Sequence, residues 1–322
     1  MRMIKSVVLL AAGFIASFGA ASLLAQGAKP FRIGTGPSAG TYHAIGSIIA
    51  GTVSDSSGVT VTPVSSTGSV ANVEAVAAGR SESALIQADV TYWAFTATEM
   101  FDGRPPAQDL RTIANLYQES IHLVVRKEAG IQTVADLRGK RVSLDEQGSG
   151  TLADAKLVLA GWGLKESDVS AEYLPLAAAI QKIKAGTLDA FFHVGGYPVA
   201  PIVDLANSET PIDLAPIDGP NAEKLRGEYK FFAREEIPTG TYKGLSAART
   251  LSVAAQWVTS TKVDAGAVYA ATKGLWSEKT RQALEAGHPK GKIISRDNAL
   301  HGIGIPLHPG AERFYREAGL IN

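Results

Sequence analysis

Segments typical of β-strands alternate with segments typical of α-helices along almost the whole chain, with short turns between them. The pattern begins with an expected strand at Phe31–Thr35, a helix at Tyr42–Val53 and a second strand at Val59–Val64. It continues to a last expected helix at Glu278–Ala286. Such alternation predicts the α/β fold class, with mainly parallel sheet and helices on both faces.

The chain is too long for one comfortable hydrophobic core. Roughly 295 residues follow the expected leader, and that length favours two domains. No Pro-rich or charged linker separates two halves, so we expect two interleaved lobes between which the chain crosses twice. The outward crossing is expected near Leu116–Val125 and the return near Leu251–Thr259. These crossings assign residues 30–118 plus 251–322 to lobe 1 and residues 119–250 to lobe 2.

Residues 1–25 have the pattern of a signal peptide. Arg2 and Lys5 precede the apolar run Val7–Leu24, and small residues follow near Ala25. A positive start, an apolar centre and small residues at the cleavage point are typical of an exported chain. The alternative is an N-terminal membrane anchor, since the run approaches the ~18 residues that span a bilayer. We expect cleavage after Ala25.

The composition excludes several classes of protein. The chain has 31 basic and 31 acidic side chains; loss of Arg2 and Lys5 with the leader leaves 29 against 31, a net charge of −2. That balance gives no support for binding nucleic acid or an anionic membrane. The chain has no cysteine, which excludes disulfides and a lipid-modified cysteine anchor. An exported, untethered protein of this kind is expected in the periplasm.

Four turns combine glycine with serine or threonine between an expected strand and an expected helix. In a doubly wound sheet such turns lie at the carboxyl ends of the strands, where ligands bind. Their backbone N–H groups and hydroxyls are suited to a small ligand with an anionic group. For any one turn taken singly, the simpler interpretation is a helix N-cap. Two precede the outward crossing and two follow it, so together they predict a cleft between two lobes: Thr35–Thr41, Ser65–Ser69, Gln147–Thr151 and Val194–Pro198.

Two familiar motifs are present only in part. Gly36-Pro-Ser-Ala-Gly40 has the spelling of the hydrolase nucleophile elbow, with Ser38 as nucleophile, but it follows the first strand and lacks the upstream sheet that the elbow needs. Gly34 and Gly36 match a dinucleotide fingerprint weakly, because the third glycine position is Ala39. The histidines show no metal-ligand spacing, so no metal or cofactor is expected.

Several single residues near these turns remain open to two interpretations. Tyr42, Tyr117 and Tyr197 lie where an aromatic ring can wall a ligand, and ordinary packing explains each equally well. Gln87 is a plausible amide ligand, whereas Asp89 is interpreted as a helix cap. Whether Glu119 or His193 contacts the ligand is left open.

The order and spacing of several motifs resemble one protein family over essentially the whole mature chain. The family is the TAXI family, the solute-binding subunits of tripartite ATP-independent periplasmic (TRAP) transporters. The motifs that carry the resemblance are Ile33-Gly-Thr-Gly with Gly40-Thr-Tyr42, Thr67-Gly-Ser-Val-Ala-Asn72, Gln87-Ala-Asp89, Leu116-Tyr-Gln-Glu119, Val134-Ala-Asp-Leu-Arg-Gly-Lys-Arg-Val142, Gly148-Ser-Gly-Thr151, Ala190-Phe-Phe-His-Val-Gly-Gly-Tyr-Pro198 and Ile237-Pro-Thr-Gly-Thr-Tyr-Lys243.

The resemblance implies a type II periplasmic-binding-protein fold, with two interleaved α/β lobes, a hinge and a ligand cleft. It implies a monomeric, non-catalytic receptor that closes on a glutamate-like or dicarboxylate-like solute and delivers it to TRAP membrane subunits. Alternatives are an ATP-driven (ABC) importer, a hydrolase using Ser38 and a sensory ligand-binding protein. The residues expected to bind ligand are Ser38, Tyr42, Thr67, Ser69, Gln87, Tyr117, Ser149, Thr151, Gly196 and Tyr197.

Overall fold

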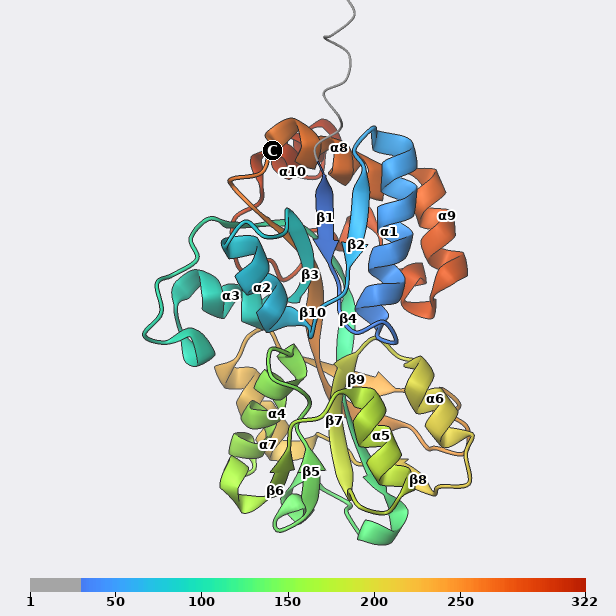
Figure 1. Ribbon diagram of the computed structural model, residues 1–322. Helices are drawn as coiled ribbons and strands as arrows, with labels where there is room; N and C mark the ends of the chain where they lie inside the picture. Colours follow the sequence, from blue (N-terminus) through green and yellow to red (C-terminus); the bar gives the residue numbers. More distant parts are fainter. Residues whose placement is uncertain (1–29) are drawn as a thin grey trace, which may run out of the picture.

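Two long strands run through the length of the molecule and join its two halves. The computed structural model describes residues 30–322, so the expected signal peptide at residues 1–25 lies outside the described part. Strand β4 (Leu110–Arg126) has 17 residues and β10 (Ala248–Ser260) has 13. They pair antiparallel, from Leu110 opposite Ser260 to Ser120 opposite Ser252. Figure 1 shows the two strands passing from the upper half, lobe 1, into the lower half, lobe 2.

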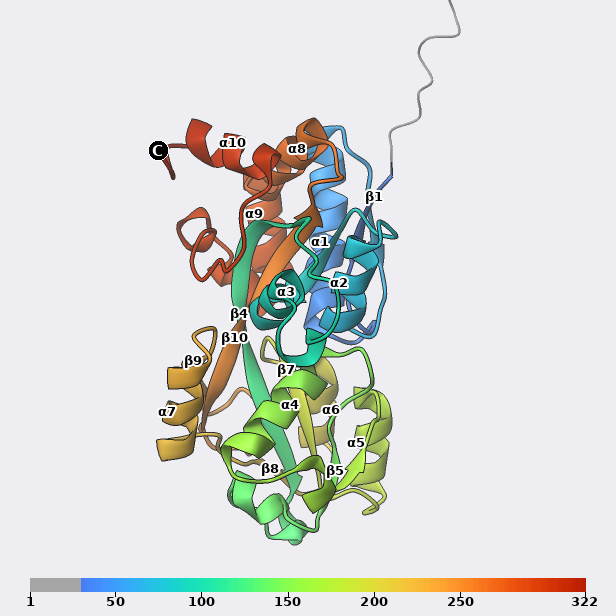
Figure 2. The ribbon, with the colours of Figure 1, turned by 90° about the vertical axis from the view of Figure 1, so that its left-hand side faces the viewer.

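Lobe 1 is built on one end of this strand pair. The strand order there is β2-β1-β3-β10, and Figure 2 shows α2 and α3 on one side of the sheet, with α8 and α9 behind it. The elements are β1 (Phe31–Gly34), β2 (Val61–Val64), β3 (Ser83–Gln87), α1 (Thr41–Ser57), α2 (Ser69–Ala77), α3 (Ala88–Thr96), η1 (Glu99–Phe101), α8 (Ala265–Leu275), α9 (Glu278–Gly287), η5 (Pro289–Ile293), η6 (Arg296–Asn298) and α10 (Pro309–Glu317).

Lobe 2 continues the same sheet from the other end of the strand pair. Its main order is β4-β7-β5-β6, while β8 pairs with β4 and β9 with β10. The elements are η2 (Lys127–Ala129), η3 (Val134–Leu137), β5 (Arg141–Ser143), α4 (Gly150–Gly161), η4 (Glu166–Asp168), β6 (Ser170–Glu172), α5 (Leu176–Lys184), β7 (Ala190–Gly195), α6 (Ala200–Ala206), β8 (Ile212–Leu214), α7 (Gly219–Glu228) and β9 (Ala233–Ile237).

The sheet is mixed, which corrects the expectation of mainly parallel strands. The outer pairs, β1 with β2 and β3 and β5 with β6 and β7, are parallel, as βαβ units require. The central pairs are antiparallel, because the chain leaves lobe 1 along β4 and returns along β10. Both expected crossings therefore fall within long strands. The exact division into residues 30–118 plus 251–322 and 119–250 stays a prediction.

Hydrophobic cores lie on both faces of the sheet in each lobe. In lobe 1 the largest buried side chain is that of Trp257 on β10, whose ring meets Phe31 edge-on at 6.2 Å between centroids. A second cluster under α2 and α3 contains Val73, Ile86 and Trp93. Burial on both faces fixes the register of the strands, so the turns at their ends have defined positions.

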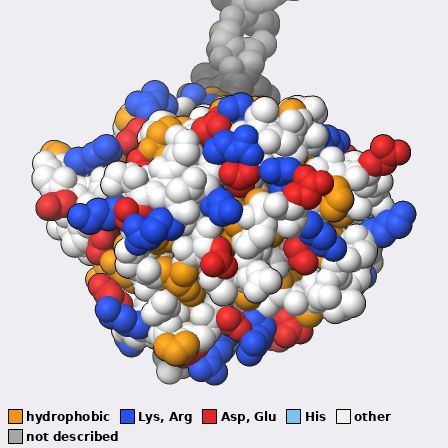
Figure 3. Space-filling model, turned by 90° about the horizontal axis from the view of Figure 1, so that it is seen from below, with side chains coloured by type: hydrophobic (Ala, Val, Ile, Leu, Met, Phe, Trp, Pro, Cys, Tyr) orange, Lys and Arg blue, Asp and Glu red, His pale blue; other side chains and the backbone are white. Residues whose placement is uncertain are grey.

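The outer surface of lobe 2 carries both signs of charge. Figure 3 shows Lys and Arg interspersed with Asp and Glu on the face seen from below, where neither sign dominates. Among residues 30–322, no helix combines the length and apolar character that crossing a bilayer requires.

Candidate functional site

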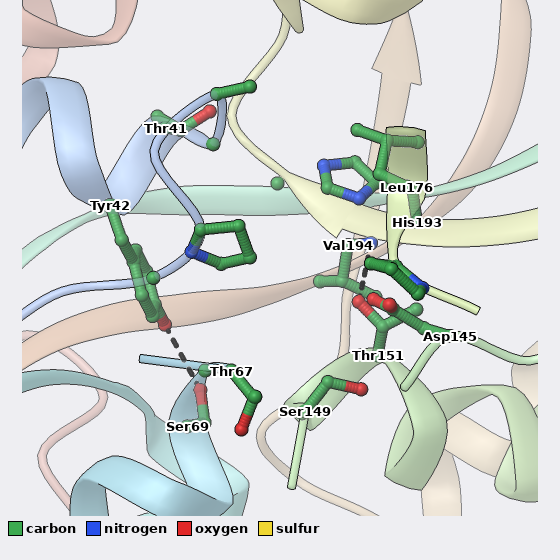
Figure 4. Close-up of a pocket in the computed structure, with 18 of the residues that line it drawn as sticks. Thr41, Tyr42, Thr67, Ser69, Asp145, Ser149, Thr151, Leu176, His193 and Val194 are labelled. Atoms are coloured by element: carbon green, nitrogen blue, oxygen red, sulfur yellow. Dashed lines mark hydrogen bonds between the residues drawn. The ribbon is translucent and has the colours of Figure 1, made fainter. Parts of the chain in front are cut away.

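A cavity of about 180 Å³ lies where the two lobes meet, and all four glycine-containing turns contribute to it. Figure 4 shows Tyr42, Thr67 and Ser69 of lobe 1 on one side and Asp145, Ser149, Thr151 and His193 of lobe 2 on the other. A fifth segment at the start of α5 also lines it. The lining residues are Gly36–Tyr42, Thr67–Ser69, Gln87, Glu119, Asp145, Ser149–Thr151, Pro175–Ala177, His193–Gly195 and Pro201.

The structure brings seven of the ten expected ligand-binding residues to this cavity. They are Ser38, Tyr42, Thr67, Ser69, Gln87, Ser149 and Thr151. Ligand contact itself stays a prediction for each of them.

The other three residues are not among those that line the cavity. Tyr117 is buried in the core of lobe 1. Gly196 accepts a hydrogen bond through its carbonyl from Thr41 Oγ1, at 3.0 Å. Tyr197 donates its hydroxyl proton to Glu235 Oε1 at 3.1 Å, and the Lys290 ammonium lies 3.7 Å from the centre of its ring.

The two lobes touch each other around the cavity. The carbonyl oxygen of Gly148 in lobe 2 accepts hydrogen bonds from the backbone N–H groups of Val70 and Ala71 in lobe 1, at 3.1 and 3.0 Å. A second contact between the lobes is the hydrogen bond from Thr41 Oγ1 in lobe 1 to the carbonyl oxygen of Gly196 in lobe 2. Gly148 has φ 88° and a Cβ there would lie 2.6 Å from Thr67 Oγ1, so glycine permits this close approach. The structure is therefore a closed form of the cleft.

Two helices begin at the cavity with free backbone donors. In the described part of the chain, the N–H groups of Thr41 and Tyr42 at the start of α1, and of Gly150 and Thr151 at the start of α4, have no hydrogen-bond acceptor. Ser149 caps α4, because its Oγ accepts from Leu152 N at 3.1 Å. Helix N-termini carry partial positive charge, so these four donors suit an anionic group.

A chain of hydrogen bonds leads from β3 to a buried glutamate in the cavity wall. Gln87 N donates to Ser69 Oγ at 3.1 Å, and Tyr42 OH lies 3.4 Å from Ser69 Oγ and donates to Glu119 Oε2 at 2.6 Å. Because the one Tyr42 proton is used toward Glu119, Ser69 is the donor to Tyr42. Burial raises the pKa of Glu119 to about 8, so this carboxyl is largely protonated at neutral pH.

His193 presents a neutral imidazole to the cavity. Burial is the main reason that its pKa falls to about 3, and neither ring nitrogen has a partner among the described residues. Next to it, His122 Nδ1 lies 2.9 Å from the Ser120 carbonyl oxygen, which makes Nδ1 the donor. Its Nε2 then accepts from Tyr242 OH at 2.9 Å. His193 thus offers a ligand one donor and one acceptor.

Asp145 is a cavity residue that the sequence analysis did not single out. It follows β5 and has φ 75°, a left-handed conformation that Asp tolerates better than most residues. Its Oδ1 accepts from Glu146 N at 2.8 Å, and burial raises its pKa to about 7. Nearby, Thr151 Oγ1 accepts from Val194 N at 3.0 Å, which leaves the Thr151 proton free to bond Asp145. The sequence signal that could have identified Asp145 was its position just after an expected strand, at the edge of the sheet where ligands bind.

The cavity wall has acidic side chains. Among the described residues that line it, Glu119 and Asp145 are carboxylic acids and none is Lys or Arg. Ser38 is exposed, and no hydrogen bond joins it to a histidine or a carboxylate in the described chain, so nothing there activates it as a nucleophile. The described residues also contain no group of three His, Asp or Glu side chains arranged to hold a metal ion.

Solved structures with the same fold share little sequence with this chain. A protein from Bordetella bronchiseptica RB50 superposes with a TM-score of 0.55 at 17% identity over 90% of this chain and 82% of its own. An ABC uptake transporter substrate-binding protein from Streptococcus pneumoniae with bound histidine gives 0.51 at 14% identity over 83% and 94%. The GluR0 ligand-binding core in complex with L-glutamate gives 0.50 at 13% identity over 83% and 99%.

These likenesses confirm the expected fold class, the type II periplasmic-binding-protein fold with two α/β lobes. At family level, the NMT1-like family matches residues 33–319, which is nearly all of the described chain. The protein belongs to the NMT1-like family.

Proposed function

We propose that this protein is an exported receptor that binds a small solute between its lobes and delivers it to a membrane permease. The observation that carries the proposal is the cavity formed jointly by both lobes. Among the residues that line it are the first residues of α1 and α4, whose backbone N–H groups have no acceptor in the described chain. Ligand that touches both lobes favours the closed arrangement and shifts the population toward it. Membership in the NMT1-like family supports a binding role.

The solute carries both an anionic and a cationic group, as an amino acid does. A dry engineered cavity of ~150 Å³ holds benzene, so about 180 Å³ fits a ligand of similar or slightly larger size. The free N–H groups at Thr41, Tyr42, Gly150 and Thr151 suit a carboxylate. An ammonium beside Glu119 would restore the ionised form of that carboxyl. The names of two neighbours with this fold include bound L-glutamate and bound histidine.

A dicarboxylate without an amine fits the cavity less well. Its second carboxylate would lie in a wall that has Glu119 and Asp145 but no basic side chain. Glu119 is already largely protonated at neutral pH, but Asp145, whose pKa is about 7, would have to take up a proton, at a cost of affinity at neutral pH.

A thermal-shift screen of the mature protein with matched pairs of compounds tests the proposed ligand class. L-Glutamate is compared with 2-oxoglutarate, and L-alanine with pyruvate, because each pair differs only at the amine carbon. We expect at least one amino acid to raise the melting temperature and its keto acid to have a smaller effect. Equal shifts within every pair would refute the proposal that the solute is zwitterionic. If no compound in the panel binds, the proposed receptor function is refuted.

Substitutions separate the two ends of the ligand. Glu119→Gln should weaken binding of the amino acid and leave its keto acid unaffected. Thr67→Ala together with Ser149→Ala should weaken both, whereas Thr62→Ala, on an exposed part of β2, should weaken neither. Unchanged dissociation constants in the first two variants would contradict the assignment of the cavity as the binding site.

The permease is proposed to be of the TRAP type, on the resemblance of the sequence motifs. A second candidate is an ABC importer, since the S. pneumoniae neighbour is named as a component of one. Uptake of radiolabelled solute in the native cell distinguishes the two. Uptake that stops when ion gradients are collapsed but ATP is maintained supports TRAP, and uptake that persists under that treatment supports the ABC importer.

A further inference from the structure

Two buried carboxyl groups face each other across the junction between the lobes. Asp89 belongs to α3 of lobe 1 and Asp154 to α4 of lobe 2, and both are 0% exposed. Gln87 Nε2 donates to Asp154 Oδ2 at 2.6 Å, and Val90 N donates to Asp89 Oδ1 at 2.7 Å. The other oxygens, Asp154 Oδ1 and Asp89 Oδ2, have no donor among the described residues.

A proton between the two carboxyl groups resolves this arrangement. Two adjacent carboxylates cannot both ionise in a buried site, and an unpaired buried acceptor costs free energy. Burial is the main cause that raises the pKa of both carboxyls, and the charge of Asp89 raises that of Asp154 further. With the proton on Asp154, its hydroxyl donates to Asp89, and all four oxygens take part in hydrogen bonds.

Among residues 30–322, no Lys or Arg side chain acts on the pair to stabilise its ionised form. Glu119 on β4 adds a third buried carboxyl: its charge raises the pKa of Asp154, and the charge of Asp89 raises the pKa of Glu119. Tyr42 from α1 and Lys290 from η5 act on Glu119 rather than on the pair. These surroundings favour retention of the shared proton.

We propose that the Asp89–Asp154 pair makes closure of the two lobes take up a proton, so that acid favours the closed form. The inference rests on the hinge closure proposed above. When the lobes separate, Asp154 moves away from Asp89 and both carboxyls meet water, where an aspartate has a pKa of about 3.9. Because the closed form has the higher pKa, its advantage is complete below about pH 4 and is lost as the pH rises through the closed-form value. In that interval one proton changes the ratio of closed to open molecules by up to about tenfold per pH unit.

The test measures the distance between the lobes without any solute. The natural chain has no cysteine, so Thr62→Cys on β2 and Gln181→Cys on α5, both at exposed positions, give two unique sites for nitroxide labels. Double electron–electron resonance then gives the closed and open populations from pH 4 to pH 9. This parent is compared with Asp154→Asn, which is isosteric. In that variant the amide oxygen of the new side chain accepts from Gln87 and its nitrogen donates to Asp89, so the contact no longer needs a proton.

In the parent we expect the closed fraction to fall as the pH rises. In Asp154→Asn the slope should be shallower by up to about tenfold in the closed-to-open ratio per pH unit, because closure of the variant no longer takes up the shared proton. Asp89→Asn should act in the same way, and the exposed control Asp102→Asn should match the parent. The proposal is overturned if both aspartate variants keep the parental slope, or if the parental distances do not depend on pH. Circular dichroism confirms that each variant is folded. Because no solute is present, neither result depends on whether the protein is a receptor.

Discussion

Replacement of Gly150 by alanine should hold the cleft open without harming either lobe. A Cβ at Gly150 would lie 1.3 Å from Gln87 Oε1, whereas real Cβ contacts are essentially never below 3.0 Å. Gly150 begins α4 in lobe 2 and Gln87 ends β3 in lobe 1, so the clash exists only when the lobes are closed. The Gln87 side chain must then swing away from its position.

The structure sets the size of the effect. Once displaced, Gln87 loses the hydrogen bond from Nε2 to Asp154 Oδ2, which is 2.6 Å long and buried. Leaving the buried Asp154 Oδ2 without its donor costs about 1–3 kcal/mol. Since 1.36 kcal/mol corresponds to a factor of ten, the affinity of any solute that binds by closure should fall by roughly fivefold to 150-fold.

Isothermal titration calorimetry of the solute found by the screen measures this loss, and denaturant unfolding without solute measures stability. Gly51→Ala is the matched control, because Gly51 lies in α1 with no atom within 4 Å of its added Cβ. It should leave affinity unchanged and stabilise the protein by about 0.5–1 kcal/mol. If Gly150→Ala binds the solute with the parental affinity, the reasoning is refuted. It is also refuted if the free energy of unfolding falls by as much as the free energy of binding, because the clash would then exist in the open form too.

Three further predictions concern stability. Trp257→Ala removes the largest fully buried side chain and should lower the free energy of unfolding by about 3–5 kcal/mol in a urea titration. Tyr242→Phe leaves His122 Nε2 without its donor and should cost about 1–3 kcal/mol in the same assay, while Tyr242→Leu should cost more because packing is lost too. The Arg141 guanidinium, 2.6 Å from Asp189, holds the pKa of that carboxyl well below its usual range, so its stabilisation is present above about pH 4 and is lost as the pH falls below that value. Asp189→Asn should therefore be less stable than the parent at pH 7, with a smaller difference at pH 2; a constant difference would contradict this assignment.

The expected elements at the start of the chain agree well with the structure, because each was marked by a local signal. The expected helix at Tyr42–Val53 lies inside α1 (Thr41–Ser57), and the return crossing at Leu251–Thr259 lies inside β10. Helices α7 and α10 were not predicted. Helix α7 has an average hydropathy too low to show a strong apolar face, and only Ala222 and Leu225 in it are buried. Tertiary contacts stabilise such a helix, and its sequence has no amphipathic pattern from which it could be predicted.

Antiparallel pairing at the centre of the sheet was hidden for a different reason. The sequence indicated two crossings between lobes, but the direction in which β4 and β10 pass each other depends on the path of residues 127–247 between them. The local secondary-structure propensity of the sequence does not determine that path. Once two crossings in opposite directions are accepted, antiparallel pairing follows, so the mixed sheet was implied by the interleaved lobes although the alternation of elements favoured a parallel one.

Asp89 shows the limit of local interpretation at the site. An acidic residue in the first turn of a helix is commonly a cap or a partner for the helix dipole, and that interpretation was natural here. In the structure Asp89 does lie in the first turn of α3, where its Oδ1 accepts from Val90 N at 2.7 Å, but it also lies against Asp154 of the other lobe. The two aspartates are far apart in sequence and come from elements that meet only across the cleft, so no spacing rule connects them.

The serine and threonine turns allow both a structural and a functional interpretation, and the hydrogen bonds show that the two are compatible. Ser149 Oγ uses its acceptor capacity to cap α4, and Thr151 Oγ1 uses its own to hold Val194 at the end of β7. Each hydroxyl keeps one proton: that of Thr151 bonds Asp145, and that of Ser149 can still be donated toward the cavity. In both residues the hydroxyl oxygen therefore accepts a structural hydrogen bond, while the hydroxyl proton is still able to form another. A cavity built from such groups presents donors to an anion and has few acceptors for a cation, which gives the buried carboxyls of Glu119 and Asp145 their importance.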